Sequence, residues 1–260
     1  MISPIPHIET RKIYPQTFLI EVVWQIRYSL EVKEENYSVF RDYIKTFFNN
    51  NLSEEAYSAI GILSIRYDRE NEEAKVKFTN TFAEFKFRAS QYQSFETSVQ
   101  AMLWGFLDLL SKCNAQLWHI SCDKKNLVEI AIPKVDNEDM ILRLSLKKEA
   151  LQLPTKLISA GDLQQDFTPS IRFLHVSDNN LALQALYGVY YNNSDDSTPD
   201  SDLTKYGIMV ESKCESKLAS VSYTEVKEIS WRINSALYDF IHWFLAEELI
   251  DLMSSNPEKE

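Results

Sequence analysis

The sequence predicts an α+β protein whose antiparallel sheets form two loosely similar halves, with long amphipathic helices packed on one face and a long helix near the C-terminus. Strand-like segments alternate between apolar and polar residues, and short links between several of them favour antiparallel pairing. Three other segments repeat apolar residues every three or four positions, as one face of a helix requires. Strands followed by a helix occur twice along the chain, so we expect two α+β units.

Residues 1–133 are predicted to form the N-terminal half. Its opening strand, 20–28, carries β-branched and aromatic residues at every second position. A helix follows, in which Tyr37, Phe40 and Ile44 share one face. The remaining predicted elements are a three-strand meander at 60–67, 73–79 and 82–89, a helix at 94–113, and a hairpin of strands 116–121 and 127–132 around a turn at 122–126.

Residues 134–253 are predicted to form the C-terminal half, an antiparallel sheet followed by a long helix. The final helix covers 223–253 and opens with a capping box, in which Ser222 is followed three residues later by Glu225. Residues 254–260 are predicted to be a disordered tail. The other elements of this half are strands at 140–146, 171–176, 181–191 and 206–214, a linker or long loop at 154–169, and a polar loop at 192–202.

Composition excludes several classes of function. The chain has 260 residues, a net charge of −11 and only five glycines, all isolated. Clustered glycines, which phosphate-binding loops need, are missing, so we expect no nucleotide cofactor. The acidic balance argues against sequence-blind binding to nucleic acid. Three cysteines suit a reducing compartment, and no run of residues is long and apolar enough for a membrane span, so we expect a cytoplasmic protein.

The final helix is the first candidate site, because apolar residues surround most of its circumference. A surface helix in a monomer usually needs only one apolar stripe. The excess favours an interface with a protein partner or a second copy of the chain, and large aromatic residues often dominate such interfaces. The predicted partner-binding residues are Trp231, Tyr238, His242 and Trp243. Packing of the same residues against the rest of the chain is the alternative.

A basic sheet face is the second candidate site. Six cations fall on predicted strands and, if they share one face, would hold a phosphate backbone or an acidic partner segment. They are Arg27, Arg66, Lys75, Lys77, Lys86 and Arg88. Within the same meander, Asp68, Glu84 and Lys86 resemble the Asp…Glu-x-Lys metal site of nucleases, which makes a metal-dependent nuclease the enzymatic alternative. The Glu-x-Lys pattern also occurs elsewhere in the chain, for example at 73–75, 211–213 and 225–227.

Cys113, His119 and Cys122 lie close enough in sequence to suggest zinc ligands. On a strand, however, residues three positions apart point to opposite faces, so His119 and Cys122 are expected to diverge. We therefore predict no zinc site.

The chain resembles a family of sporadically distributed bacterial proteins of unknown function, about 250 residues long. The resemblance depends on the early strand at 21–27, the passage from Tyr92 to Phe95-Glu96 after residues 82–88, and the long terminal helix. The family often carries Arg-Tyr-Ile-Asn in the strand after the second helix, where this chain reads differently, at 117–123. The resemblance implies an accessory protein of mobile, defence or CRISPR loci and supplies no catalytic residue. With the residues above, it favours a non-catalytic interaction or regulatory protein.

Overall fold

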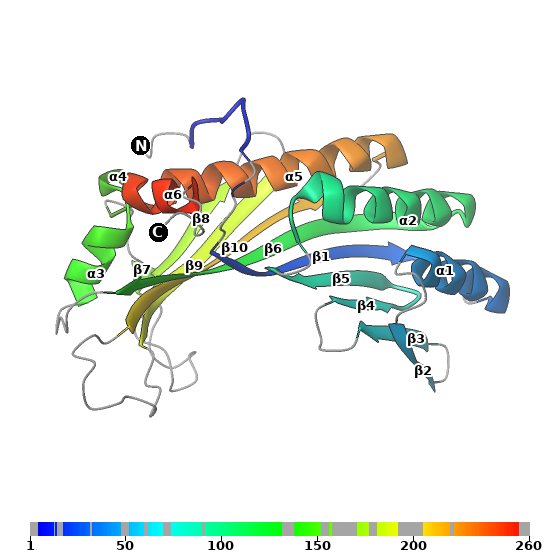
Figure 1. Cartoon of the computed structure of the whole chain (residues 1–260). Helices are drawn as coiled ribbons and strands as arrows, with labels where there is room; N and C mark the ends of the chain where they lie inside the picture. The colour runs from blue at the N-terminus through cyan, green and yellow to red at the C-terminus, as the bar shows by residue number, and fades with distance from the viewer. Residues whose placement is uncertain are drawn as a thin grey trace, which may run out of the picture.

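Ten antiparallel strands form one continuous sheet in the computed structural model, and helices lie on one side of it (Figure 1). The structure describes residues 5–12, 14, 18–31, 33–47, 52–59, 62–69, 74–89, 92–131, 138–151, 156–157, 171–176, 181–191, 205–218 and 221–254. The strands are β1 (Leu19–Ser29), β2 (Leu52–Ala59), β3 (Ile62–Arg69), β4 (Ala74–Phe78), β5 (Phe82–Arg88), β6 (Gln116–Ala131), β7 (Lys156–Leu157), β8 (Ile171–Val176), β9 (Leu181–Tyr191) and β10 (Lys205–Lys217). The helices are α1 (Glu34–Phe47), a π-helical turn (Glu96–Gln100) that leads into α2 (Ala101–Lys112), α3 (Glu138–Ser145), α4 (Lys148–Leu151), α5 (Tyr223–Phe244) and α6 (Glu247–Ser254).

The two halves of the sheet follow the same strand order, counted from the centre to the edge. The full order is β2-β3-β4-β5-β1-β6-β10-β9-β8-β7, with β1 and β6 at the centre. On each side, the central strand (β1 or β6) is followed in sequence by one or two short helices. Four strands come next, of which the first lies at the edge of the sheet and the last beside the central strand. A long helix, α2 or α5, completes each side. This arrangement confirms the α+β class, and it joins the two loosely similar halves edge to edge through β1 and β6.

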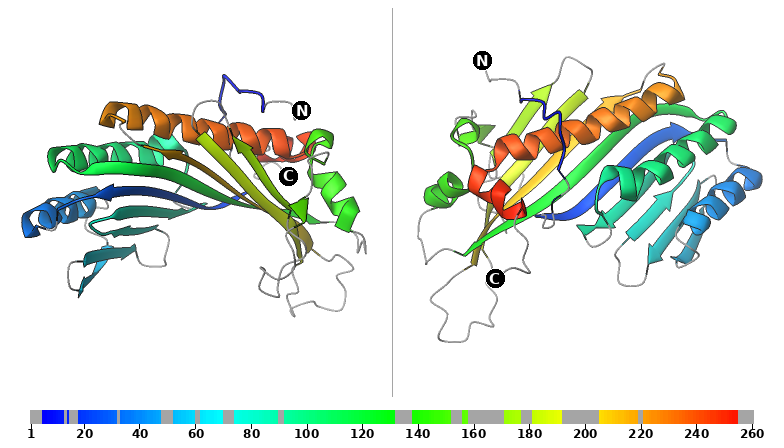
Figure 2. Two further views of the ribbon diagram at one scale, coloured as in Figure 1. Left: turned by 180° about the vertical axis from the view of Figure 1, so that it is seen from behind. Right: turned by 45° about the horizontal axis from the view of Figure 1, so that its top comes forward.

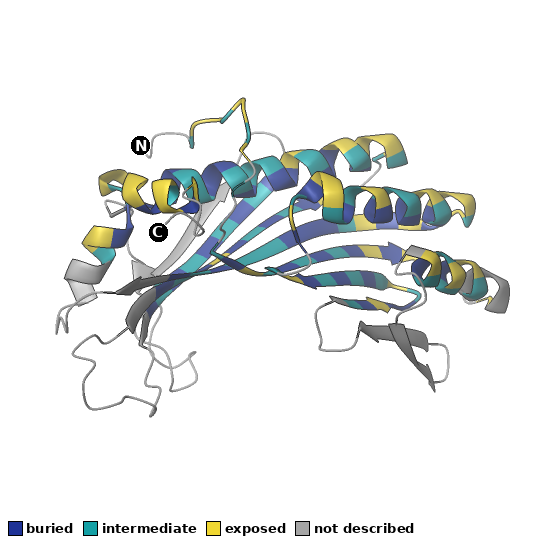
Figure 3. Ribbon diagram, viewed as in Figure 1, coloured by how far each residue is buried: buried dark blue, intermediate teal, exposed yellow. Residues whose placement is uncertain are grey.

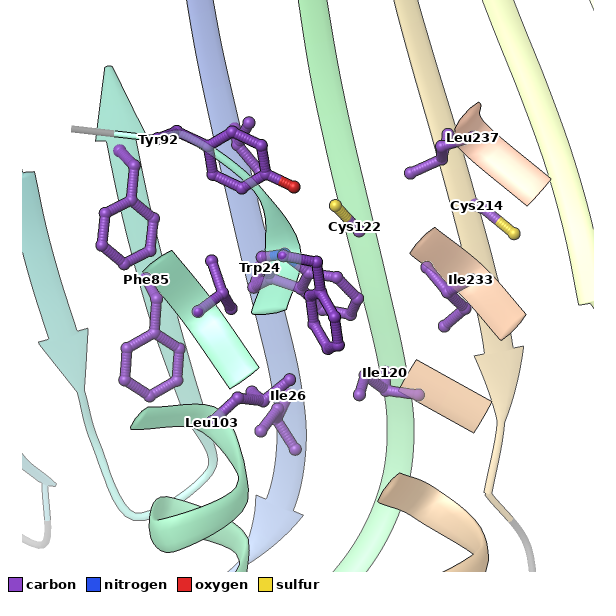
Figure 4. Close-up of a cluster of buried hydrophobic side chains, with 14 of the residues drawn as sticks. Trp24, Ile26, Phe85, Tyr92, Leu103, Ile120, Cys122, Cys214, Ile233 and Leu237 are labelled. Carbon is purple, nitrogen blue, oxygen red and sulfur yellow. The ribbon is translucent and has the colours of Figure 1, made fainter. Parts of the chain in front are cut away.

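The core fills the space between the sheet and the helices. Residues of β1 alternate between buried and partly exposed positions, and Figure 3 shows the same alternation on the strands whose burial is described. Trp24, Ile26 and Phe85 come from the first half of the sheet, while Ile233 and Leu237 come from α5, and all five pack into one cluster (Figure 4). Burial of these side chains stabilises both halves together, at roughly 1.5–3 kcal/mol for each large apolar group.

The predicted hairpin at 116–132 is wrong, because β6 is a single strand through the predicted turn at 122–126. The polar run that suggested a turn pairs with β1 on one side and with β10 on the other. These pairings join residues far apart in the sequence, and they outweigh the local turn propensity.

The predicted strand at 140–146 is also wrong, because this segment forms α3. Leu142, Leu144 and Leu146 would share one face of a strand. In the structure Leu146 is buried and Leu142 packs against the core, whereas Leu144 is 47% exposed. The spacing of four between the two inward residues belongs to a helix.

The long terminal helix is divided in two. α5 begins at the predicted capping box, in which Ser222 and Glu225 exchange hydrogen bonds. It ends at Phe244, because Leu245 is extended, with a ψ of 148°, and forms an isolated bridge with Leu146. α6 then begins at Glu247.

Other predictions fall partly or wholly outside the described residues. The loop at 192–202 and residues 255–260 of the tail lie outside them, and of the linker at 154–169 only β7 is described. The predicted three-strand meander forms as β3, β4 and β5, and β2 precedes it. In the part of the chain that the structure describes, no helix combines the length and apolar character that crossing a bilayer requires.

Candidate functional site

The start of the chain covers the side of α5 that faces away from the sheet. Residues 5–12 and 14, the N-terminal segment, run across α5 before the chain enters β1 (Figures 1 and 2). The residues that form hydrogen bonds between the two elements are 224 to 232 positions apart in sequence. The contacts between them involve the carboxylate of Asp239, two aromatic rings around Arg11, and His242.

Asp239 of α5 binds the first part of the N-terminal segment. Its side chain is mostly buried, and its two oxygens contact His7 Nδ1 at 2.8 Å and the backbone N–H of Ile8 at 3.2 Å. A buried carboxylate needs such donors, because an unpaired charge away from water is costly. Asp239 therefore acts as an acceptor for a peptide backbone.

Arg11 lies in an aromatic clamp on α5. Its guanidinium carbon is 4.9 Å from the centroid of the Trp231 ring and 5.6 Å from that of Tyr238. The guanidinium also donates to the hydroxyl of Ser235, and Nη1 lies 3.8 Å from a carboxylate oxygen of Glu96. A cation over two aromatic faces gains about 0.5–2 kcal/mol per ring, depending on desolvation.

His242 closes the far end of the contact. Its Nδ1 lies 2.8 Å from the carbonyl oxygen of Tyr238, so this nitrogen is the donor, since a carbonyl only accepts. Nε2 is then the acceptor for the hydroxyl of Tyr14, 2.6 Å away. Burial lowers the pKa of His242, which favours this neutral form. The backbone N–H of Lys12 also donates to the Tyr238 hydroxyl, at 3.0 Å.

Three of the four predicted partner-binding residues contact the N-terminal segment directly, and the fourth, Trp243, lines a second cavity together with Pro6 and Ile8 of that segment. Trp231, Tyr238 and His242 form the flank beneath the N-terminal segment. Trp243 is only 9% exposed and packs beside Phe240. Sequence reasoning missed the covering segment, because no local pattern in residues 5–14 indicates which distant element they contact.

A cavity of about 660 Å³ lies below the same contact. Its walls come from the N-terminal segment, from residues 89 and 92–97, from β6 and from α5. Lys124 enters it from the helix-covered face of β6 and donates to Oδ1 of Asn234, at 2.9 Å. The Lys124 ammonium is also 5.6 Å from the centroid of the Tyr92 ring. Desolvation by burial lowers the pKa of Lys124 and raises that of Tyr92.

Five of the six predicted cations occupy the opposite face of the sheet. Backbone register places them together: Lys75 pairs with Lys86, which pairs with Val23, and Lys77 pairs with Glu84, which pairs with Gln25. Arg88 and Arg27 lie on the same side of β5 and β1. Arg66 pairs with Lys77, so its register position is one that belongs to the same face. Its side chain lies outside the described part of the structure.

Acids are interleaved with these cations, so this open face has mixed charge. Lys86 is ion-paired with Glu21, and Glu215 contacts both Lys213, at 3.2 Å, and His119, at 3.3 Å. Among the residues of β1, β4, β5, β6 and β10 whose side chains the structure describes, eight cations and five acids lie on this face. The cations are Arg27, Lys75, Lys77, Lys86, Arg88, Lys125, Lys213 and Lys217, and the acids are Glu21, Glu84, Asp123, Glu211 and Glu215. Binding of nucleic acid here stays a prediction.

The nuclease-like set is spread over strands that are not adjacent. Asp68 pairs with Lys75 on the neighbouring strand, and Lys75 pairs with Lys86, so β3 and β5 are separated by the whole of β4. Two strand spacings amount to about 9.5 Å, so Asp68 and Glu84 are not cross-strand neighbours, and metal-dependent nuclease activity stays a prediction. Lys86 is also engaged by Glu21.

Cys113, His119 and Cys122 diverge as the strand geometry predicts. His119 contacts Glu215 on the open face, whereas Cys122 is buried in the core and Cys113 ends α2. Among the described residues, no group of three or more His, Cys, Asp or Glu side chains has the geometry to hold a metal ion.

Comparison with known proteins gives no family for this chain. A scan against protein-family models finds no match, and a search of curated proteins finds no significantly similar sequence. The resemblance to sporadically distributed bacterial proteins therefore stays a prediction.

Proposed function

We propose that this is a non-catalytic, cytoplasmic interaction protein that binds an extended, arginine-bearing segment of a protein partner on the flank of α5. The observation that carries this proposal is the placement of Arg11 between Trp231 and Tyr238. Here the chain's own N-terminal segment occupies the surface on which the partner would bind.

The contacts are of the kind that recognises peptides. Asp239 and the Tyr238 hydroxyl accept backbone N–H groups of the segment, which gives affinity for any extended chain. The aromatic clamp then selects an arginine side chain, since a planar guanidinium stacks on aromatic faces better than an ammonium does. Main-chain contacts with one selective pocket are a common mode of peptide recognition.

An intramolecular segment also makes the interaction regulatory. A tethered segment competes at a high effective concentration, in the millimolar range for short linkers, so a partner must displace it. Partner binding then depends on how tightly Arg11, His7 and Tyr14 hold the flank.

The test uses the full-length chain and a labelled peptide with the sequence of residues 5–14. Arg11→Ala loosens the internal segment, so this variant is expected to bind the peptide at least about tenfold more tightly than the unaltered protein does. Fluorescence anisotropy measures the affinity. Adding Trp231→Ala and Tyr238→Ala to the Arg11→Ala variant should abolish binding.

Lys12→Ala is the matched control, because only the backbone of Lys12 is needed at the Tyr238 hydroxyl. It is expected to leave the affinity unchanged. Failure of the Arg11→Ala variant to bind the peptide, with its circular dichroism unaltered, would show that the segment is a fixed part of the fold and would refute the proposal.

A further inference from the structure

The cavity below the N-terminal segment contains two cationic groups, those of Lys124 and Arg11. Each has N–H donors left over after its hydrogen bonds to described residues. The ammonium of Lys124 has three donors, and its one hydrogen bond to a described residue is that to Asn234. Nη1 of Arg11 is buried and makes no hydrogen bond, since the nearest Glu96 oxygen is 3.8 Å away. Donors left unmet in a buried place destabilise the folded chain, so an acceptor inside the cavity would be stabilising.

The charge of the cavity also favours an acceptor that is negative. The described charged residues on its walls are Arg11, Lys12, Lys124 and Glu96, which sum to two positive charges in a chain whose net charge is −11. The carboxylate of Glu96 lies 3.8 Å from Arg11 and offsets its charge. Because the Glu96 side chain is 40% exposed, this pair belongs to the solvent-facing part of the cavity. The two excess positive charges are those of Lys124, on the sheet side, and of Lys12, in the N-terminal segment.

The remaining walls indicate the size and nature of the occupant. Asn126 and Asn234 add amide groups beside Lys124, whereas Leu237, Ile241 and Met253 give an apolar wall. A volume of about 660 Å³ falls within the range of roughly 300–1,000 Å³ that small-molecule sites have in proteins. These walls fit an acidic head group attached to an apolar body.

We propose that this cavity binds a small organic anion, with its carboxylate or phosphate held by Lys124 and Arg11. The cavity shares Arg11, Tyr238 and His242 with the peptide-binding flank of α5, so it is complete only while the N-terminal segment lies on that flank, as it does in the structure. Anion binding requires no protein partner, so it can be measured whether or not a partner peptide binds. Lys124 supplies the charge from the sheet, and Arg11 supplies it from the N-terminal segment.

Phenyl phosphate, benzoate and benzamide test the site, because they share one ring and differ in the head group. Calorimetric titration and thermal unfolding are performed on the full chain at constant ionic strength. We expect one or both anions to bind and to raise the unfolding temperature, and benzamide to do neither. The stronger of the two anions identifies the head group as phosphate or carboxylate.

Lys124→Met removes the charge at nearly constant volume, and we expect it to weaken anion binding at least about tenfold. Lys125→Met is the matched control, because Lys125 is the next residue of β6 and lies on the opposite, open face. Its affinity should equal that of the unaltered protein. If Lys124→Met does not fold, Lys124→Gln, which keeps a polar side chain beside Asn234, supplies the same comparison.

Three outcomes would overturn the proposal: neither anion binds, benzamide binds as well as the anions do, or Lys124→Met retains the full affinity. Each would show that the unused donors are satisfied by water, as buried polar groups often are.

Discussion

Asp123 is a carboxylic acid placed among other acids on the open face of the sheet. Its pKa is raised from 3.8 to about 6, mainly by burial; Lys213 acts in the opposite direction, and Glu211, Glu215 and Glu84 add to the rise. Its partners across the ladder are Val23 on β1 and Lys213 on β10. The folded protein therefore holds this proton more tightly than the unfolded chain does.

The raised pKa predicts a dependence of stability on pH. Below about pH 4 the carboxyl is protonated in both states, and its contribution to stability is complete. As the pH rises toward 6, the unfolded chain releases the proton first, so this contribution is lost. We expect Asp123→Asn to raise the free energy of unfolding by about 2 kcal/mol above pH 6 and to have little effect at pH 4.

Urea unfolding at several pH values measures this difference. Glu248→Gln, which removes one negative charge from an exposed position of α6, is the control. An Asp123→Asn effect that is the same at pH 4 and pH 8 would contradict the prediction.

At the scale of the element, α1 and α2 approach each other closely at one glycine. A β-carbon at Gly105 would overlap the hydroxyl of Tyr43, which donates toward the carbonyl oxygens of Ala101 and Met102, at 3.2 and 3.1 Å. The glycine therefore lets a tyrosine of α1 lie against the backbone of α2.

Gly105→Ala is expected to lower the free energy of unfolding by about 1–2 kcal/mol, because Tyr43 must move and its hydrogen bonds are lost. In the Tyr43→Ala background the space is open, and the same substitution is expected to stabilise by up to about 1 kcal/mol through helix propensity. Urea unfolding of the four proteins gives both values. An equal cost of Gly105→Ala in both backgrounds would show that Tyr43 is not the cause.

The elements also show where local patterns failed. Leu142, Leu144 and Leu146 have the period of a strand, yet the chain forms α3, because the core contacts only the first and third of them. Likewise the polar residues at 122–126 favour a turn when they are read alone. Long ladders with β1 and β10 keep them in β6.

At the scale of the whole molecule, the two halves share one sheet and one core. β6 pairs with β1 of the first half and with β10 of the second, and α5 packs over the buried residues of both. The symmetric strand order divides the chain between α2 and β6, whereas the sequence suggested a boundary at residue 133.

This continuity predicts one cooperative unfolding transition. Trp24, which is fully buried at the centre of the sheet, belongs to the shared core. Trp24→Ala is expected to cost about 3–5 kcal/mol and to move the whole transition to lower temperature. Differential scanning calorimetry checks this prediction through the ratio of calorimetric to van 't Hoff enthalpies. Two separate transitions, with only the first affected by the substitution, would indicate independent halves.

The sequence by itself determined the α+β class, most of the strands, the amphipathic helices and the capping box at Ser222, because these depend on the spacing of apolar residues and on short-range hydrogen bonds. It also identified Trp231, Tyr238 and His242 as unusual for a surface helix. Only the tertiary structure decided what covers them and that Lys124 and Arg11 enter one cavity. Those contacts join residues more than a hundred positions apart, and no local pattern encodes such pairings.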